Sequence, residues 1–185
     1  MFEKILKKIE LLINIFSTLF YKYRFRKFGS NSVVRFGCIL NSPNNIEIGK
    51  NVYINKYVWL NSNDWRKDGR ASLIIGDGTY IGRFSQINAF QDVVIENNVL
   101  IADNVYFGDV DHGIKDKKNP IKNNKFEFKG SILIKEGSFI CRNAVISAGT
   151  IVGKNSIVAP GTYVIQKIVP DYSMAIGNPS RIVKI

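Results

Sequence analysis

Large aliphatic residues recur every six positions in the second half of the chain. From Ile134 the sequence reads IKEGSF ICRNAV ISAGTI VGKNSI VAPGTY V. The large residues are Ile134, Ile140, Ile146, Val152, Val158 and Val164, and small residues follow four positions after the first five, at Ser138, Ala144, Thr150, Ser156 and Thr162. The pattern also lies upstream in pieces, at Ile48, Ile54 and Leu60, at Ile75, Ile81 and Ile87, and at Ile95, Ile101 and Phe107, with small partners that include Val52, Val58, Thr79, Ser85, Val99 and Val105.

A period of six fits neither a helix nor a hairpin sheet. An amphipathic helix needs apolar spacings of three and four, and a half-buried strand alternates at every second position. The period instead predicts a coil with three short flat sides and about 18 residues per turn, in which the large residue fills the interior and the small residue permits a tight corner. Equivalent sides of successive turns then pair as parallel strands, so the fold is a solenoid. The unbroken register disfavours the alternative, a β-sandwich with accidental spacing.

The breaks in this repeat predict where the chain leaves the solenoid, because insertions become loops on one face. Leu60 and Ile75 are 15 residues apart, so residues 61–72 are expected to protrude as a loop. Ile87 and Ile95 are eight apart, which predicts a two-residue bulge within the segment NAFQD. Phe107 and Ile134 are 27 apart, so residues 108–131 must leave the wall and return, and they contain the only histidine, His112.

The N-terminal segment, residues 1–28, predicts an amphipathic helix over about 2–27 that precedes a solenoid domain at 29–185. It holds seven basic and two acidic residues. The apolar stretch from Ile9 to Tyr21 is too short and too polar to span a bilayer, and no small-residue cleavage site follows it. Two interpretations remain open. The apolar face packs on its own domain or a neighbouring subunit, which is the common fate of such helices, or it lies on an anionic membrane.

Composition narrows the class of protein. The chain has 185 residues, 45% of them hydrophobic, which suits one soluble domain with a real core, and its net charge is +11. Such a charge indicates an anionic binding partner: nucleic acid, a membrane surface or a phosphorylated ligand. No nucleic acid is expected as a partner, because no binding motif is present and the basic residues are spread along the chain. Two distant cysteines, Cys38 and Cys141, favour a reducing cytoplasm over a disulfide framework.

The segment around His112 is the place to look for chemistry. Histidine is the usual general base at neutral pH, and acyl transfer from a thioester to a hydroxyl needs one. Asp109 and Asp111 lie beside it, and either carboxylate could orient the imidazole. By itself, a lone histidine in a lysine-rich loop is more often an ordinary surface residue.

A family resemblance changes that balance. The segment IENNVLIADNVYFGDVDHG resembles the part of galactoside, maltose and polysaccharide O-acetyltransferases that ends in their catalytic histidine, and the closing GNPSRIV resembles their ending GNPARVI. The chain, over about residues 30–185, thus resembles the hexapeptide-repeat acyltransferases. Glu96 departs from the glycine of their pattern. The resemblance implies a mainly β, left-handed parallel β-helix and a homotrimer with active sites between subunits. The handedness follows from the resemblance alone, because ordinary parallel crossovers are right-handed.

The resemblance also implies roles for single residues. His112 falls on the general base, while Asn88 and Asp92 fall where relatives contact the acceptor sugar. Asn88 has an alternative interpretation as a turn residue or a member of an asparagine ladder. Residues on the acetyl-CoA side of the predicted site are Phe139, Arg142, Lys154, Pro160, Lys167 and Arg181. Arg142 would serve through its backbone N–H near the thioester carbonyl. The two lysines have an alternative interpretation as solvated surface residues.

The sequence therefore predicts an acetyl-CoA-dependent O-acetyltransferase that acts on a sugar hydroxyl in surface polysaccharide biosynthesis by direct transfer. We expect it in the cytoplasm, with the N-terminal segment able to meet the inner face of the membrane. Alternatives are a xenobiotic O-acetyltransferase, an amino-sugar N-acetyltransferase and a non-catalytic scaffold. No metal is expected, since the zinc carbonic anhydrases that share this fold need three histidine ligands.

Overall fold

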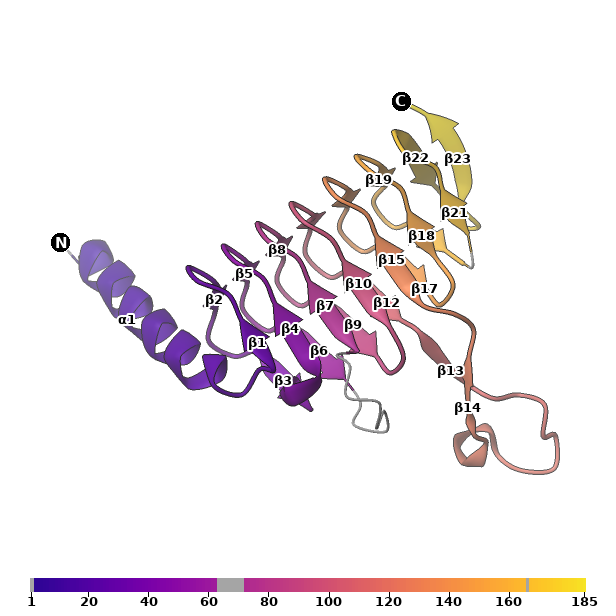
Figure 1. Cartoon of the computed structure of the whole chain (residues 1–185), viewed down its shortest axis with the longest axis horizontal. Helices are drawn as coiled ribbons and strands as arrows, with labels where there is room; N and C mark the ends of the chain where they lie inside the picture. The colour runs from indigo at the N-terminus through magenta and orange to yellow at the C-terminus, as the bar shows by residue number, and fades with distance from the viewer. Residues whose placement is uncertain (1, 63–71, 166) are drawn as a thin grey trace.

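The computed structural model describes residues 2–62, 72–165 and 167–185, which form one helix followed by a three-sided parallel β-helix (Figure 1). The helix α1 spans Phe2–Lys22. Each turn of the coil then places one strand in each of three sheets. The strands of every sheet run parallel, except that the last strand of the second sheet, β23, is antiparallel to β22.

The first sheet contains β1 (Lys27–Phe28), β4 (Ile46–Ile48), β7 (Leu73–Ile75), β10 (Val93–Ile95), β15 (Ile132–Ile134), β18 (Ile151–Val152) and β21 (Ile168–Val169). The second contains β2 (Val33–Val34), β5 (Tyr53–Ile54), β8 (Tyr80–Ile81), β11 (Leu100–Ile101), β16 (Phe139–Ile140), β19 (Ile157–Val158), β22 (Ser173–Ile176) and β23 (Arg181–Lys184). The third contains β3 (Ile39–Asn41), β6 (Trp59–Ser62), β9 (Gln86–Ala89), β12 (Tyr106–Gly108), β17 (Val145–Ser147) and β20 (Tyr163–Val164).

Three corners join these sheets. Corner 1 leads from the first sheet to the second (for example residues 153–156), corner 2 from the second to the third (159–162), and corner 3 from the third back to the first (148–150). The chain passes each corner once per turn, so residues on one corner form a row along the molecule.

The interior confirms the repeat. Every large residue of the six-residue pattern is at most 1% exposed, and the small partners are equally buried. The structure adds an earlier turn that the pattern missed, with Val34 and Leu40 inside, and a later one with Val169 and Ala175. The first turn escaped detection because the short 3-10 helix η1 (Pro43–Asn45) shifts the register before Ile48.

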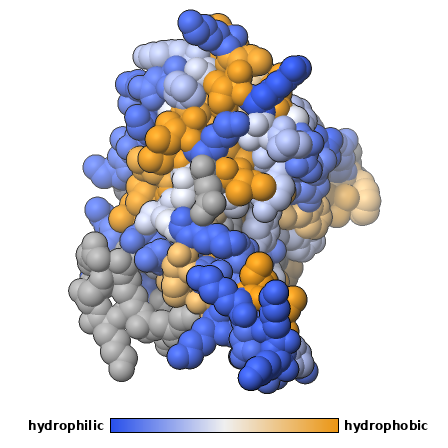
Figure 2. All heavy atoms as spheres, turned by 90° about the vertical axis from the view of Figure 1, so that its right-hand side faces the viewer, coloured by the Kyte–Doolittle hydropathy of each residue, from blue (hydrophilic) through white to orange (hydrophobic). Residues whose placement is uncertain are grey.

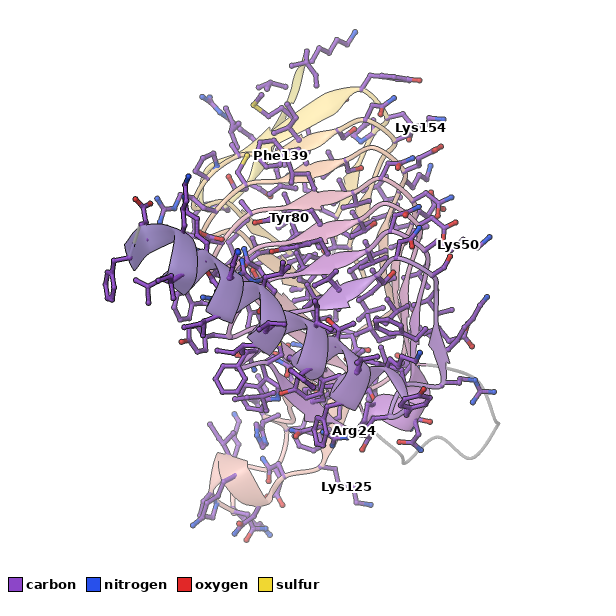
Figure 3. All side chains as sticks on the ribbon, turned by 90° about the vertical axis from the view of Figure 1, so that its left-hand side faces the viewer. Arg24, Lys50, Tyr80, Lys125, Phe139 and Lys154 are labelled. Atoms are coloured by element: carbon purple, nitrogen blue, oxygen red, sulfur yellow. The ribbon has the colours of Figure 1, made fainter. Side chains whose placement is uncertain are left out.

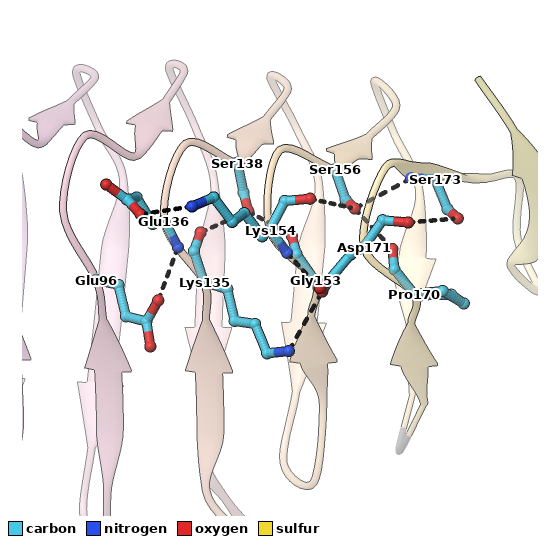
Figure 4. A network of polar contacts seen from close by, with 10 residues as sticks. All are labelled: Glu96, Lys135, Glu136, Ser138, Gly153, Lys154, Ser156, Pro170, Asp171 and Ser173. Atoms are coloured by element: carbon cyan, nitrogen blue, oxygen red, sulfur yellow. Dashed lines mark hydrogen bonds and ion pairs between the residues drawn. The ribbon is translucent and has the colours of Figure 1, made fainter.

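The small residues do more than leave room at corner 1. Ser156 Oγ donates to the Pro170 carbonyl at 2.7 Å and accepts the Ser173 N–H at 3.1 Å. Thr79 makes the same pair of bonds to Glu96 and Val99 in the next turn. Buried hydroxyls therefore tie successive turns together, as the row of serines in Figure 4 shows. At Glu96, the departure from the family glycine, the carboxylate Oε2 accepts the backbone N–H of Glu136 at 2.8 Å.

Residues 108–131 leave the wall as predicted. β12 ends at Gly108 and β15 begins at Ile132, and between them β13 (Val110–His112) pairs antiparallel with β14 (Phe126–Phe128). This hairpin stalk was not predicted. Beyond it, a loop with the 3-10 helix η2 (Ile121–Asn123) projects from the molecule and is largely hydrophilic (Figure 2). Most of the other predicted loop, residues 61–72, lies outside the described residues.

The N-terminal helix is shorter than expected, because α1 ends at Lys22 and the first coil begins at Lys27. It lies across the first turn of the coil, against β2 (Figures 1 and 3). The interpretation that its apolar face packs on its own domain is wrong, since Ser17 is its one buried residue. Within the described residues, no helix combines the length and apolar character needed to cross a bilayer.

Candidate functional site

His112 stands at corner 3, where the wall of the solenoid opens. It is the last residue of β13 and is exposed, and it lies in register opposite Phe126 of β14. The two ring centroids are 4.8 Å apart, and Phe126 also lies 5.9 Å from the ring of Phe90. The antiparallel stalk and these aromatic neighbours place the imidazole beside the coil.

An open pocket of about 340 Å³ surrounds the imidazole. Its lining comes from the third sheet, the corner 3 turn and the stalk: Asn61, Asn88, Phe90, Tyr106, Val110, Asp111, His112 and Phe126. The structure thus brings together two residues that the sequence proposed separately, His112 and Asn88. Aromatic walls with a few polar groups are typical of small-molecule sites.

Asn88 belongs to an asparagine ladder, the alternative interpretation raised from the sequence. Asn41 donates to Asn61 Oδ1 at 3.2 Å, and Asn61 donates to Asn88 Oδ1 at 3.0 Å, since the three residues are register partners in the third sheet. The register continues to Gly108, which has no side chain to extend the ladder. No bond from Asn88 Nδ2 forms within the described residues, so the ladder fixes the amide and leaves a donor at the pocket.

Asp109 does not reach the imidazole. It is fully buried, and its carboxylate accepts the backbone N–H groups of Phe90 at 2.9 Å and Gln91 at 2.6 Å. Burial raises the pKa of this carboxyl, against the lowering effect of the backbone hydrogen bonds. Asp109 therefore shapes the turn after β9, which is the site of the predicted bulge. In this way it places Phe90 in the pocket.

Asp111 lines the pocket and pairs with Lys129. Its Oδ2 lies 3.0 Å from Lys129 Nζ, and this contact raises the pKa of the lysine. Within the described part of the chain, neither aspartate forms a hydrogen bond to the His112 ring. Asp111 is the one of the two whose carboxylate is exposed at the pocket.

The remaining candidates for acceptor and donor contact lie in different places. Asp92 is at corner 3, half-buried, and its carbonyl accepts the N–H of Ile132 at 2.9 Å, but it does not line the pocket. Lys167 is also at corner 3, with its Nζ 2.6 Å from the Ser180 carbonyl. Both belong to the His112 side of the molecule.

The other donor candidates do not share that corner. Arg142 and Pro160 are at corner 2, Phe139 begins β16 in the second sheet, and Arg181 begins β23. Lys154 is at corner 1, where it pairs with Glu136 at 3.0 Å in the network of Figure 4 and lies along the same row as Lys50 in Figure 3. One chain therefore presents His112 and five of the six predicted donor residues on separate sides, and Lys167 is the exception.

Sequence reasoning missed Tyr106, Phe90 and Phe126 as pocket residues. Tyr106 carried a signal, because it lies between the buried Val105 and Phe107 and must point outward, beside Gln86 of the preceding turn. A Cβ at Gly108 would lie 2.8 Å from Tyr106 Oη, so this glycine makes room for the phenol. Phe126 carried no signal, because only the stalk brings it to His112. The described residues contain no group of three or more His, Cys, Asp or Glu side chains that could hold a metal ion.

Comparison with known proteins gives one sequence relative. No protein-family model matches the chain. A protein of Mycobacterium tuberculosis described as a probable acetyltransferase is 32% identical over 114 residues. The match covers 61% of this chain but only 37% of the mycobacterial protein, so this chain spans well under half of that relative's length.

Solved structures extend the likeness over most of the chain. AntD, an N-acyltransferase from Bacillus cereus in complex with dTDP and 3-hydroxybutyryl-CoA, superposes with a TM-score of 0.74 at 17% identity, covering 89% of this chain and 85% of that one. A hexapeptide-repeat acetyltransferase from Vibrio cholerae in complex with acetyl-CoA gives 0.64 at 20% identity, covering 96% and 83%. At these identities the likeness establishes the fold. The chain has the left-handed parallel β-helix of hexapeptide-repeat acyltransferases, as predicted.

Proposed function

We propose that the chain is an acetyl-CoA-dependent O-acetyltransferase that modifies a sugar hydroxyl in surface polysaccharide biosynthesis, in the cytoplasm. The observation that carries this proposal is the position of His112. The one histidine of the chain stands in an open pocket, beside an amide donor, where the coil of a known acyltransferase fold is interrupted. The coenzyme A ligands of the structurally similar proteins support the donor, and the net charge of +11 suits its phosphates.

The residues of the pocket suit direct transfer. His112 accepts the proton of the sugar hydroxyl while that oxygen attacks the thioester carbonyl, and the thiolate of coenzyme A takes the proton when the C–S bond breaks. Asn88 Nδ2 and the Tyr106 hydroxyl lie where they can hold the sugar. Asp111 is the aspartate we assign to the imidazole, because Asp109 is committed to the turn at Phe90.

The site is completed by a neighbouring copy in this proposal. The pocket is at the small end of ligand pockets, which run about 300–1,000 Å³, so it suits one sugar unit rather than a sugar and coenzyme A together. The predicted donor residues Phe139, Arg142 and Pro160 lie off corner 3 in the same chain. A three-fold assembly that sets corner 3 of one copy against the later turns of corner 2 of the next, where Arg142 and Pro160 lie, would unite base and donor.

An amino-sugar N-acyltransferase is the second candidate. Two observations favour it: AntD, which shares the fold, is an N-acyltransferase, and no aspartate is hydrogen-bonded to His112 within the described residues. An amine is the stronger nucleophile and needs less help from a base. A nucleotide-linked sugar is then an acceptor to test.

The test of the proposed function is the variant His112→Asn. Loss of a positioned base lowers kcat by roughly 10²–10⁴-fold. Thiol release from acetyl-CoA is measured with a panel of nucleotide sugars, glycans and xenobiotic alcohols, and Lys118→Gln, in the same loop, is the matched control. Near-wild-type transfer by a folded His112→Asn protein would refute the role of His112, and no turnover of any acceptor by the wild type would favour a scaffold.

The product separates the two acceptor classes. An O-acetyl ester is cleaved by hydroxylamine and an N-acetyl amide survives, and mass spectrometry before and after treatment reads this directly. An ester supports the main proposal, and an amide supports the second candidate.

A further inference from the structure

The helix α1 packs on the coil with its polar side. Thr18 Oγ1 exchanges hydrogen bonds with the backbone of Val34, donating at 3.2 Å and accepting at 3.1 Å. The Tyr21 hydroxyl donates to the Cys38 carbonyl at 3.0 Å. Glu10 forms ion pairs with Arg35 and Lys56, which lower the pKa of its carboxyl. Residues 10, 14, 17, 18 and 21 share one side of a helix, so this polar stripe is the side that meets the coil.

The apolar side of α1 consequently faces away from the coil. Its members recur at helical spacing and are each 44–74% exposed: Phe2, Ile5, Leu6, Ile9, Leu12, Ile13, Phe16, Leu19 and Phe20. We call this set the outer stripe. Figure 3 views this end of the molecule, with α1 in front of the strands. An amphipathic helix that turns its polar side to its own domain has its apolar side available for something else.

The outer stripe continues onto the coil. Phe36 is 59% exposed and shares one hollow with Ile13, Phe16 and Phe20 of the helix. Further along corner 2, Tyr57 and Phe84 are also exposed and stack with their centroids 5.2 Å apart. The apolar surface thus extends from the helix along corner 2.

Positive charge surrounds this surface. Among the described residues no acidic partner is found for Lys4, Lys8, Lys22, Arg24 or Lys27, whereas Glu3 and Glu10 are each paired with cations. Lys4 and Lys8 are one turn apart along the flank of the outer stripe, and Arg24 and Lys27 follow the helix. An apolar stripe flanked by basic residues complements an interface that is apolar inside and anionic outside.

We propose that the outer stripe of α1, with Phe36, docks the protein on an anionic lipid bilayer, with the helix axis in the plane of the interface. A second copy packed helix to helix would bring together two segments that each carry seven basic and two acidic residues, on chains of net charge +11, whereas anionic headgroups neutralise the unpaired cations. The coil then stands on the membrane by its first turn, and the stalk β13–β14, which carries His112, leaves the coil three turns further along (Figure 1).

The test is vesicle flotation with the full chain. Wild-type protein should float with vesicles of phosphatidylcholine and phosphatidylglycerol and not with phosphatidylcholine alone, and added salt should weaken the binding. Phe16→Ser with Phe20→Ser should lower the partition coefficient at least about tenfold, because two aromatic side chains no longer enter the interface. Lys4→Gln with Lys8→Gln should lower it roughly 30-fold on anionic vesicles. Ile114→Ser with Ile121→Ser, equally exposed in the distal loop, is the matched control and should bind as wild type.

A conservative variant covers the case in which the serine substitutions impair folding. Phe16→Trp keeps an aromatic side chain at an exposed site, and its fluorescence should shift to the blue on anionic vesicles, while Ile121→Trp should not shift. Wild-type protein that stays with the unbound fraction at low salt overturns the proposal. The proposal is also overturned if the double variant Phe16→Ser with Phe20→Ser has a smaller oligomer mass than the wild type but binds vesicles equally well. That result would show that a second copy covers the outer stripe.

Discussion

At the residue scale, the two aspartates beside His112 turn out to have different surroundings. Asp109 is buried and holds two backbone N–H groups, while Asp111 is exposed at the pocket and paired with Lys129. Asp109 precedes the histidine by three residues and Asp111 by one, and the sequence could not decide which of them orients the ring. The structure separates their surroundings, because the burial and backbone contacts of Asp109 depend on residues 90 and 91 in the preceding turn.

This difference predicts that Asp109→Asn mainly lowers stability and Asp111→Asn mainly lowers kcat. In Asp109→Asn, the amide oxygen can still accept one of the two backbone N–H groups, but the amide NH2 faces the other N–H and repels it. The free energy of unfolding should therefore fall by about 1–3 kcal/mol. It should also raise the KM for the acceptor, since the turn at Phe90 loosens, and leave the pH profile of kcat unchanged. Asp111→Asn should change stability by less than about 1 kcal/mol, as for an exposed ion pair, and lower kcat.

Chemical denaturation and pH-dependent kinetics measure both variants. If Asp109→Asn displaced the pH profile at unchanged stability, the buried aspartate would be the one that orients the imidazole, and the assignment of Asp111 would be wrong.

At the scale of the element, each coil turn depends on close backbone contact at its corners. A Cβ at Gly153 would lie 2.4 Å from Asp171 N and 2.5 Å from the Pro170 carbonyl carbon of the next turn. Gly161 at corner 2 has φ +67° and no atom within 4 Å of its hypothetical Cβ. One glycine is required by packing, and the other only by backbone conformation.

The two positions give a matched pair of alanine variants. Gly153→Ala should cost upwards of about 3 kcal/mol, because backbone of the next turn must move. Gly161→Ala should cost about 1–2 kcal/mol, the price of a left-handed conformation for an L-residue. Thermal and urea unfolding compare them, and equal losses would contradict the packing argument.

At the scale of the whole molecule, a solenoid separates functions along its length. The N-terminal end carries α1 and its exposed apolar stripe, and the hairpin stalk with His112 lies well along the coil (Figure 1). The donor candidates Phe139, Arg142, Lys154, Pro160 and Arg181 occupy other sides of the same prism, and Lys167 alone among the six shares the corner of His112. In the proposed trimer, a neighbouring copy would bring these parts together.

The proposed trimer predicts complementation between two defective chains. His112→Asn chains are co-expressed with chains that carry Arg181→Glu, which removes a cationic side chain from the predicted donor side. If base and donor contacts come from different copies, about a quarter of the sites in random trimers join two intact halves and regain activity. Acetyl transfer is assayed at an acetyl-CoA concentration below the wild-type KM. Analytical ultracentrifugation should give a mass of about 63 kDa, which is three copies of the 20.9 kDa chain. No regained activity in mixed trimers would place both halves in one chain.

The sequence by itself determined the coil, its interior and the place where its wall opens, because a six-residue period is a local property that each turn repeats with its own neighbours. It also singled out His112, the one base available at that opening. It missed the first turn, where the insertion at residues 43–45 hides the period.

Only the tertiary structure decided which groups surround His112 and which way α1 turns. Phe126 meets the histidine through an antiparallel stalk, Asp109 bonds to a turn made one coil earlier, and α1 sets its polar side on β2. These are contacts between segments distant in sequence. Their choice depends on hydrogen-bond partners and space that the solenoid provides once it has formed, which no local pattern of hydrophobic residues encodes.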